Sequence, residues 1–346
     1  LSNFLIYVLL ATICDVMPLR KINKTIARYT IDNFKIQNNL ALNHIFKQFD
    51  LKKKLTIDDL GFLIGPIINS GGRLNNSKYG VELLSTDNLD IIKDRSKKLI
   101  TLNNKRKKIE QNILDKIDFK KIEKENKNVI IYFNDDISEG LIGIIASRLK
   151  DYFNKPSIVV TKSNNQFKAS ARSTTTYNIG NLVKLLIDNN IIDSGGGHNM
   201  AAGFTMKKNN LKLLDNFIQK DYSKKNFNKE NSSKYDFELS PSSIRNELIN
   251  DINKLGPFGN FNFLPFILIK NLRVIKSNVI NNNHISAILK PDIGPTFKTI
   301  CFNCLNTKIG HHLLFYKKKI NIIVQIHENI WNNKKTIQLN IKDLIL

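Results

Sequence analysis

The segment from 193 to 203 combines a glycine run with a histidine and small residues: Gly195, Gly196, Gly197 and His198, then Ala201, Ala202 and Gly203. Because glycine lacks a Cβ and tolerates positive φ, backbone N–H groups in such a run can approach an anion closely. His198 can donate a hydrogen bond or a proton to the same anion. The small residues predict a helix start beside the glycines, where a phosphate would be held. A glycine-rich turn with an exposed histidine is the alternative, and this segment alone does not decide between them.

Two arginines lie in settings that suit phosphate. Arg172 stands beside the hydroxyls of Ser170 and Ser173, which together predict a phosphate clamp at a strand end. Arg73 follows two glycines, so its planar guanidinium lies on an uncrowded backbone and can grip phosphate with two hydrogen bonds. A structural salt bridge is the alternative for Arg73. By contrast, Arg148 lies among apolar residues of an expected helix and is predicted to form a structural ion pair.

Six segments resemble, in order, the motifs of the DHH phosphoesterases, and within them the RecJ-like single-strand-specific DNA exonucleases. The first is similar to the last metal-binding motif of the catalytic DHH domain and the second to that domain's closing loop. The next three resemble the DHHA1 domain. The last resembles the start of an oligonucleotide-binding (OB) domain. The segments are residues 11–19, 65–74, 140–149, 168–173, 193–203 and 255–260.

The resemblance implies roles for the residues at these positions. Asp15 would be a ligand of Mn²⁺ or Mg²⁺, the ions that polarise a phosphodiester and generate hydroxide. The alternative is that Asp15 caps a helix or lies in an exposed turn. Asn69 and Arg73 would face the catalytic cleft. The phosphate of the substrate would be bound by Ser170, Arg172, Ser173, Gly195, Gly196, Gly197 and His198.

The sequence also departs from the family pattern. It has no Asp-His-His and no Asp-x-Asp motif, so a two-metal site cannot be built from Asp15 alone. Ile67 stands where the family usually has arginine, and Ser138 where it usually has histidine. The chain begins with leucine and enters an apolar run at once. These features predict a C-terminal portion whose N-terminal part is missing and which is inactive alone.

Composition limits the class of protein. The formal net charge is +23 and the pI about 9.8, which favours a polyanionic partner because clustered cations bind phosphates and release counterions. An AT-rich coding sequence is the alternative source of so many lysines. Three cysteines exclude a disulfide scaffold, and Cys301-x-x-Cys304 is interpreted as strand and turn rather than a zinc site. The apolar run at residues 4–13 is too short to cross a membrane, so we expect a cytoplasmic protein.

The pattern of elements predicts α/β architecture followed by an all-β domain. We expect the end of a DHH domain at 1–76, one long bridging helix at 77–125 and a DHHA1 α/β domain at 126–218. A linker at 219–234 would precede an OB-fold barrel at 235–346. Residues of the barrel expected to contact nucleic acid are Lys270, Arg273, Lys276, Lys298 and Trp331.

These expectations lead to three functional hypotheses. The first is a metal-dependent 5′-to-3′ exonuclease of single-stranded DNA, active in repair and recombination alongside a single-strand-binding protein and a helicase. The second is a DHH/DHHA1 phosphoesterase of short oligonucleotides or small nucleotides, against which the expected OB domain argues. The third is a non-catalytic single-strand-binding module.

Overall fold

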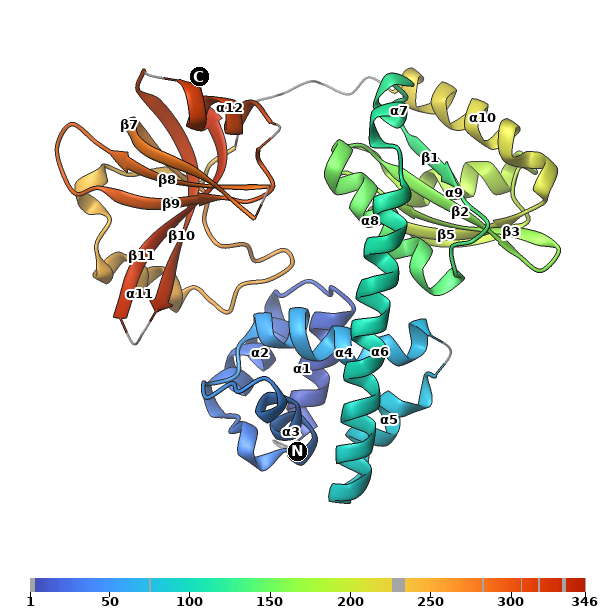
Figure 1. The fold of residues 1–346 in the computed structure, drawn as a ribbon, viewed down its shortest axis with the longest axis horizontal. Coiled ribbons are helices and arrows are strands. Elements are labelled where there is room, and N and C mark those ends of the chain that lie inside the picture. The colour runs from blue at the N-terminus through green and yellow to red at the C-terminus, as the bar shows by residue number, and fades with distance from the viewer. Residues whose placement is uncertain are drawn as a thin grey trace. The chain divides into compact units, whose positions relative to one another are not determined.

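The structure is a computed structural model that describes residues 4–74, 76–225, 234–281, 283–305, 307–316, 318–331 and 334–345, with only the backbone of 329–331 and 334–335. The chain forms two compact units (Figure 1). The barrel unit contains residues 1–35, 54–61 and 230–346, and the α/β unit contains 36–53 and 62–229. Within the described ranges, no helix is both long enough and apolar enough to span a membrane.

The α/β unit does not contain the single bridging helix that was expected at 77–125. Three helices cover this stretch, because capping residues interrupt it. Asn88 accepts hydrogen bonds from the N–H groups of Asp90 and Ile91, and Asp118 accepts one from Lys121. The expectation of one helix was therefore wrong at both ends. The helices before the sheet are α3 (Leu40–Gln48), α4 (Gly65–Arg73), α5 (Lys78–Leu84), α6 (Leu89–Lys116) and α7 (Phe119–Lys124).

A five-stranded sheet forms the centre of the α/β unit, in the order β1-β2-β3-β5-β4. Strands β1 and β2 are parallel, and the other neighbours are antiparallel. One face packs on α8 through Val159 and Ile145, and the other packs on α9 and α10 through Ala171 and Leu182. The elements are β1 (Ile130–Phe133), α8 (Glu139–Phe153), β2 (Ser157–Ser163), β3 (Gln166–Arg172), α9 (Ile179–Asp188), β4 (Ser194–His198), β5 (Ala201–Met206) and α10 (Leu211–Lys224).

The glycine run lies in strand β4, so the helix predicted at 201–203 is wrong. Residues of β4 pair in register with β5, from Ser194 opposite Thr205 to His198 opposite Ala201. Glycine is a poor strand former, but close packing overrides propensity here. A Cβ at position 195 would stand 2.6 Å from Cβ of Phe204, and one at 197 would stand 2.4 Å from the carbonyl oxygen of Ala201.

The barrel unit closes its sheet into a five-stranded barrel, as expected for an OB fold. The order is β10-β11-β9-β8-β7, and β10 pairs back onto β7. Strand β7 carries a bulge between Val274 and Lys276, where its register with β8 shifts. The elements are β6 (Phe237–Glu238), α11 (Asn246–Lys254), β7 (Ile267–Ile280), β8 (His284–Lys290), β9 (Phe297–Cys301), α12 (Lys308–Phe315), β10 (Ile320–Trp331) and β11 (Lys334–Ile345).

Helices α1 (Leu5–Cys14) and α2 (Lys21–Asn33) belong to the same unit. The N–H of Leu19 donates to the carbonyl of Asn260 at 2.7 Å, and the guanidinium of Arg28 donates to the carbonyl of Gly256. The motif at 255–260 therefore joins the barrel to these two helices. It contains a cis peptide bond between Gly256 and Pro257.

Candidate functional site

Three cross-strand rows on β3, β5 and β4 bring the predicted phosphate ligands together. Residues opposite one another in antiparallel strands point to the same face of a sheet. This face is the one on which α8 covers β2 and β3. The rows are Lys168–Thr205–Ser194, Ser170–Gly203–Gly196 and Arg172–Ala201–His198.

The two glycines of the middle row, Gly203 and Gly196, form a patch of backbone without side chains, the bare floor of this face. A Cβ at Gly196 would meet no heavy atom within 4 Å, and one at Gly203 would meet only the carbonyl oxygen of Ala169, at 3.6 Å. Adjacent strands lie about 4.8 Å apart. In the next row, the backbones of Arg172 on β3 and His198 on β4 are therefore about 10 Å apart, with Ala201 of β5 between them. A flat ligand can therefore contact the backbone between a guanidinium and an imidazole.

The orientation of His198 is fixed by its own turn and by the start of α9. Its Nδ1 accepts a hydrogen bond from the N–H of Met200 at 3.3 Å, so the neutral ring carries its proton on Nε2. The N–H of Ile179 donates to the carbonyl of Asn199 at 3.1 Å. A Cβ at Gly180 would stand 3.0 Å from the carbonyl carbon of His198. The exposed imidazole therefore presents an Nε2–H donor at the edge of the floor.

Arg172 is positioned by its neighbours on β3 and by a glycine on α8. Its Nη1 donates to Oγ of Ser170 at 3.1 Å and to the carbonyl of Ala171 at 2.8 Å. A Cβ at Gly143 would stand 3.0 Å from Nη2 of Arg172. Burial lowers the pKa of Arg172, and the positive charge of Arg73 lowers it further.

Arg73 contacts α8 at Gly140, about one helical turn before Gly143, which faces Arg172. Its Nη1 donates to the carbonyl of Gly140 at 3.1 Å. Gly140 and Gly143 are three residues apart and so lie on the same face of the helix. Burial lowers the pKa of Arg73, nearby Arg106 lowers it further, and Glu110 opposes the shift. Two partly desolvated like charges facing one glycine-lined surface favour an anion between them.

A buried carboxylate ties α6 to α8 behind this surface. Oε2 of Glu110 lies 2.9 Å from Nη1 of Arg106, and Oε1 lies 2.7 Å from Nε of Arg148. The side chain of Glu110 is only 8% exposed. The prediction that Arg148 forms a structural ion pair is confirmed.

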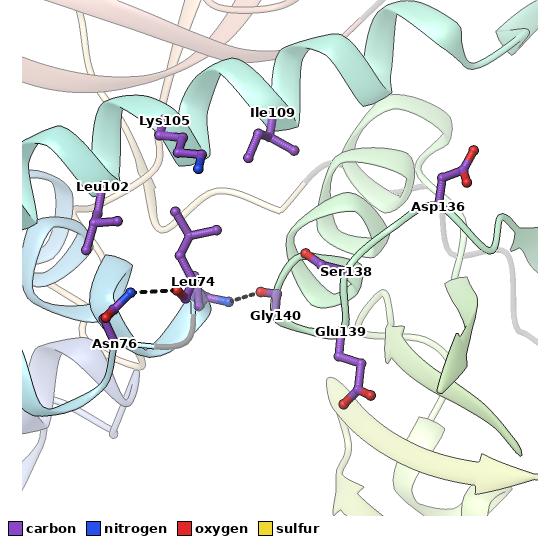
Figure 2. A pocket seen from close by; sticks show the side chains of 10 residues that line it. Leu74, Asn76, Leu102, Lys105, Ile109, Asp136, Ser138, Glu139 and Gly140 are labelled. Carbon is purple, nitrogen blue, oxygen red and sulfur yellow. Dashed lines mark hydrogen bonds between the residues drawn. The ribbon is translucent and has the colours of Figure 1, made fainter. Parts of the chain in front are cut away.

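A pocket of about 630 Å³ opens beside Arg73. Figure 2 shows Leu102, Lys105 and Ile109 of α6 along one side of it, and Ser138 to Gly140 at the start of α8 on the other. All of its lining residues belong to the α/β unit.

Some predicted ligands do not reach this face. Ser173 is 1% exposed, and its hydroxyl donates to the carbonyl of Tyr177, so the hydroxyl stabilises a turn. Gly195 and Gly197 serve close packing. Asn69, which was predicted to face the catalytic cleft and not to bind phosphate on this sheet, is exposed on α4. Sequence reasoning missed the spacing role of Gly140 and Gly143, although their Gly-x-x-Gly pattern was a usable signal.

Asp15 is the residue of this chain that was predicted to bind a metal ion. It is an exposed residue at the C-terminal cap of α1. Among the described residues, no three His, Cys, Asp or Glu side chains come close enough together to hold an ion. A single carboxylate does not make a Mn²⁺ or Mg²⁺ site, since these ions take several oxygen or nitrogen ligands. The described part of the chain therefore does not hold the two-metal site.

The predicted nucleic-acid contacts of the barrel divide into two groups. Lys270 pairs with Glu238 at 2.7 Å, and Arg273 lies 3.9 Å from Asp292. All four of these cations are exposed. Lys276 and Lys298, the second group, each pair with Ile288 in the register of the strands, so they share one cross-strand row. The side chain of Trp331 lies outside the described residues.

The aromatic and cysteine side chains of the barrel are divided between surface and core. Phe302 and Tyr316 are exposed, whereas Phe297 is buried in the barrel. Cys301 ends β9, and Cys304 lies in the turn that follows. Both are buried in the barrel core, and Sγ of Cys304 donates to the carbonyl of Cys301 at 3.3 Å.

Comparison with known proteins places these features in a family. The DHHA1 domain matches residues 126–224, and the RecJ OB domain matches residues 235–343. The chain thus has a DHHA1 domain followed by a RecJ OB domain. It is 26% identical to the single-stranded-DNA-specific exonuclease RecJ of Bacillus subtilis, over 96% of this chain and 43% of that protein. The corresponding RecJ of Haemophilus influenzae is also 26% identical, over 98% of this chain and 61% of the relative.

Solved RecJ structures share the fold. The structure of RecJ from Thermus thermophilus in complex with Mn²⁺ has a TM-score of 0.81 at 18% identity, over 100% of this chain and 50% of that one. Its complex with Mg²⁺ has a TM-score of 0.79. The chain thus spans about half the length of the RecJ proteins that it matches.

Proposed function

We propose that this chain is the strand-binding portion of a metal-dependent, single-stranded-DNA-specific exonuclease. The observation that carries the proposal is the row Arg172–Ala201–His198 beside the bare floor of Gly203 and Gly196. A guanidinium and an imidazole N–H donor can hold one phosphate of a strand from two sides. The floor without side chains lets the sugar–phosphate backbone lie close to the sheet.

The chain's own residues would bind and orient the phosphate in this scheme. Arg172 and Arg73 would neutralise its charge, and Nε2–H of His198 would donate a hydrogen bond to one of its oxygens. The exonuclease would also require Mn²⁺ or Mg²⁺ ions. Asp15 would contribute one ligand, and the remaining ligands would come from outside these residues.

The barrel supports a long substrate rather than a small nucleotide. The exposed row of Lys276 and Lys298, with Phe302 and Tyr316 exposed on the same domain, suits backbone contacts and base stacking. A 5′-to-3′ direction, a role in repair and recombination, a cytoplasmic location, and single-strand-binding protein and helicase as partners belong to the same proposal.

Binding of this chain to a fluorescent single-stranded oligonucleotide and to its duplex tests the proposal. We expect a preference for the single strand that falls steeply with salt, without cleavage when Mn²⁺ is added. Equal affinity for duplex, or no binding at low salt, would overturn it. Replacement of Arg172 by alanine should weaken binding, whereas Lys184→Ala on α9, at the opposite face of the sheet, should not.

A further inference from the structure

The turn at 259–262, which lies against α1 and α2, has a phenylalanine ring exposed on either side of Asn262. Phe261 is 50% exposed and Phe263 is 62% exposed. Asn262 itself holds the turn together, because its Nδ2 donates to the carbonyl of Pro257 at 2.8 Å. Its backbone N–H and carbonyl bond the carbonyl and N–H of Gly259 at 3.1 and 3.0 Å. The backbone of the turn is therefore fixed, and neither exposed ring belongs to the barrel core.

Phe261 adopts a backbone conformation that its side chain disfavours. Its φ is +58°, in the left-handed region that glycine tolerates and bulky side chains rarely adopt. Strain of this kind persists only where neighbouring contacts hold it, and it is concentrated at binding sites. Here the contact comes from α2, since Nε of Arg20 donates to the carbonyl of Phe261. The strained backbone keeps the Phe261 ring at the surface instead of allowing it to pack inward.

Positive charge surrounds the turn. The guanidinium carbon of Arg20 lies 5.7 Å from the centroid of the Phe261 ring, and Nζ of Lys24 lies 3.4 Å from Oδ1 of Asn262. Among the described residues, no carboxylate lies within ion-pair distance of either cation. The stretch 15–28 has one acid, Asp15, and four cations: Arg20, Lys21, Lys24 and Arg28. The turn therefore combines two exposed rings with positive charge that local acids do not cancel.

We propose that this turn is a base-stacking site for single-stranded DNA. Bases would stack on Phe261 and Phe263, and the adjoining phosphates would contact Arg20 and Lys24. Aromatic rings beside cations suit an unpaired strand, because every base has a flat π face and every nucleotide carries a phosphate. The choice of DNA over an acidic protein segment rests on the proposed function. The site belongs to the barrel unit, whereas the phosphate-binding row of Arg172 belongs to the α/β unit.

Phe261→Gly separates this role from a structural one. We expect it to weaken binding of a single-stranded oligonucleotide at least fivefold, because a stacking ring is lost. The midpoint of chemical unfolding should stay unchanged or rise, because glycine adopts this φ without strain. Phe263→Ala should weaken binding by a similar factor. The matched control is Phe4→Ala, which removes a 69% exposed ring next to α1 and should leave the affinity unchanged.

An oligonucleotide of the same length with abasic residues shows whether the rings act on bases. The loss caused by Phe261→Gly should disappear on this strand, because no base is left to stack. The site is overturned if both phenylalanine variants bind like the control, or if they lose as much affinity for the abasic strand as for the intact one. Failure of the unaltered chain to bind any oligonucleotide would remove the proposed function as well. Binding that survives both substitutions would remove this site alone.

Discussion

The backbones of Arg73 and Gly140 lie so close together that position 140 has no room for a residue larger than glycine. A Cβ at position 140 would stand 2.3 Å from the carbonyl oxygen of Arg73, and the Arg73 guanidinium closes the contact by donating to the carbonyl of Gly140. One turn later, Gly143 leaves the same kind of room for the guanidinium of Arg172. The spacing of two glycines on α8 thus sets the positions of two arginines that come from distant parts of the sequence.

Gly140→Ala should destabilise the α/β unit, because the contact it creates is with backbone that cannot rotate away. We expect a loss of about 1–3 kcal/mol, the usual cost of overpacking, measured by denaturant unfolding. Gly72→Ala is the matched control, since its Cβ would meet nothing within 4 Å. In the helix it should gain about 1 kcal/mol from propensity. Equal effects of the two substitutions would contradict the close contact.

Two neighbouring glycines of β4 should separate binding from stability. Gly196→Ala adds a methyl group to the open floor, so it should reduce oligonucleotide affinity and leave the unfolding midpoint unchanged. Gly197→Ala should destabilise the unit, because its Cβ would stand 2.5 Å from Cβ of Ala202. Fluorescence anisotropy and chemical unfolding of both variants check this. A loss of stability in Gly196→Ala would show that the floor is not open.

Arg172→Ala should weaken binding of single-stranded DNA by about ten- to a hundredfold, since hydrogen bonds to charged groups contribute about 1.5–3 kcal/mol. One lost phosphate contact should also reduce the slope of log affinity against log salt by about 0.7. Titrations at several salt concentrations measure both quantities. An affinity that falls while the slope is unchanged would mean that Arg172 acts on folding rather than on phosphate.

Glu110→Gln should destabilise the α/β unit, because two guanidiniums would lose the carboxylate between them. We expect about 2–3 kcal/mol, below the cost of breaking a fully buried pair, since the side chain of Arg148 is 56% exposed. Asp115→Asn, an exposed acid of the same helix whose carboxylate accepts from Gln111, should change stability by less than about 0.5 kcal/mol. Thermal unfolding of the two variants makes the comparison.

The alternation of strands and helices at 126–218 and the barrel were predictable, because hydrophobic period and turn residues act locally. The interruption of the long helix was also predictable, since asparagine at position 88 is a strong helix cap. The fate of the glycine run was not visible. Whether such a run forms a loop or a strand depends on the partner strand β5 and on Phe204, which lies against it in space.

The site residues show the same division between local and distant causes. Ser170 and Arg172 alternate on one strand and could be paired from sequence. Ser173 breaks the alternation, because the strand ends and its hydroxyl turns into the fold. Arg73 and Arg172 contact neighbouring turns of α8. This depends on how α8 packs over β3, which no local pattern specifies.

Strand β3 keeps two sets of side chains apart. Phe167, Ala169 and Ala171 lie in the core with α9, and Lys168, Ser170 and Arg172 lie on the other face. A substitution in the second set changes what the sheet can hold without disturbing the packing that keeps it folded. Ligand preference in this domain can therefore drift over evolutionary time while the scaffold is conserved.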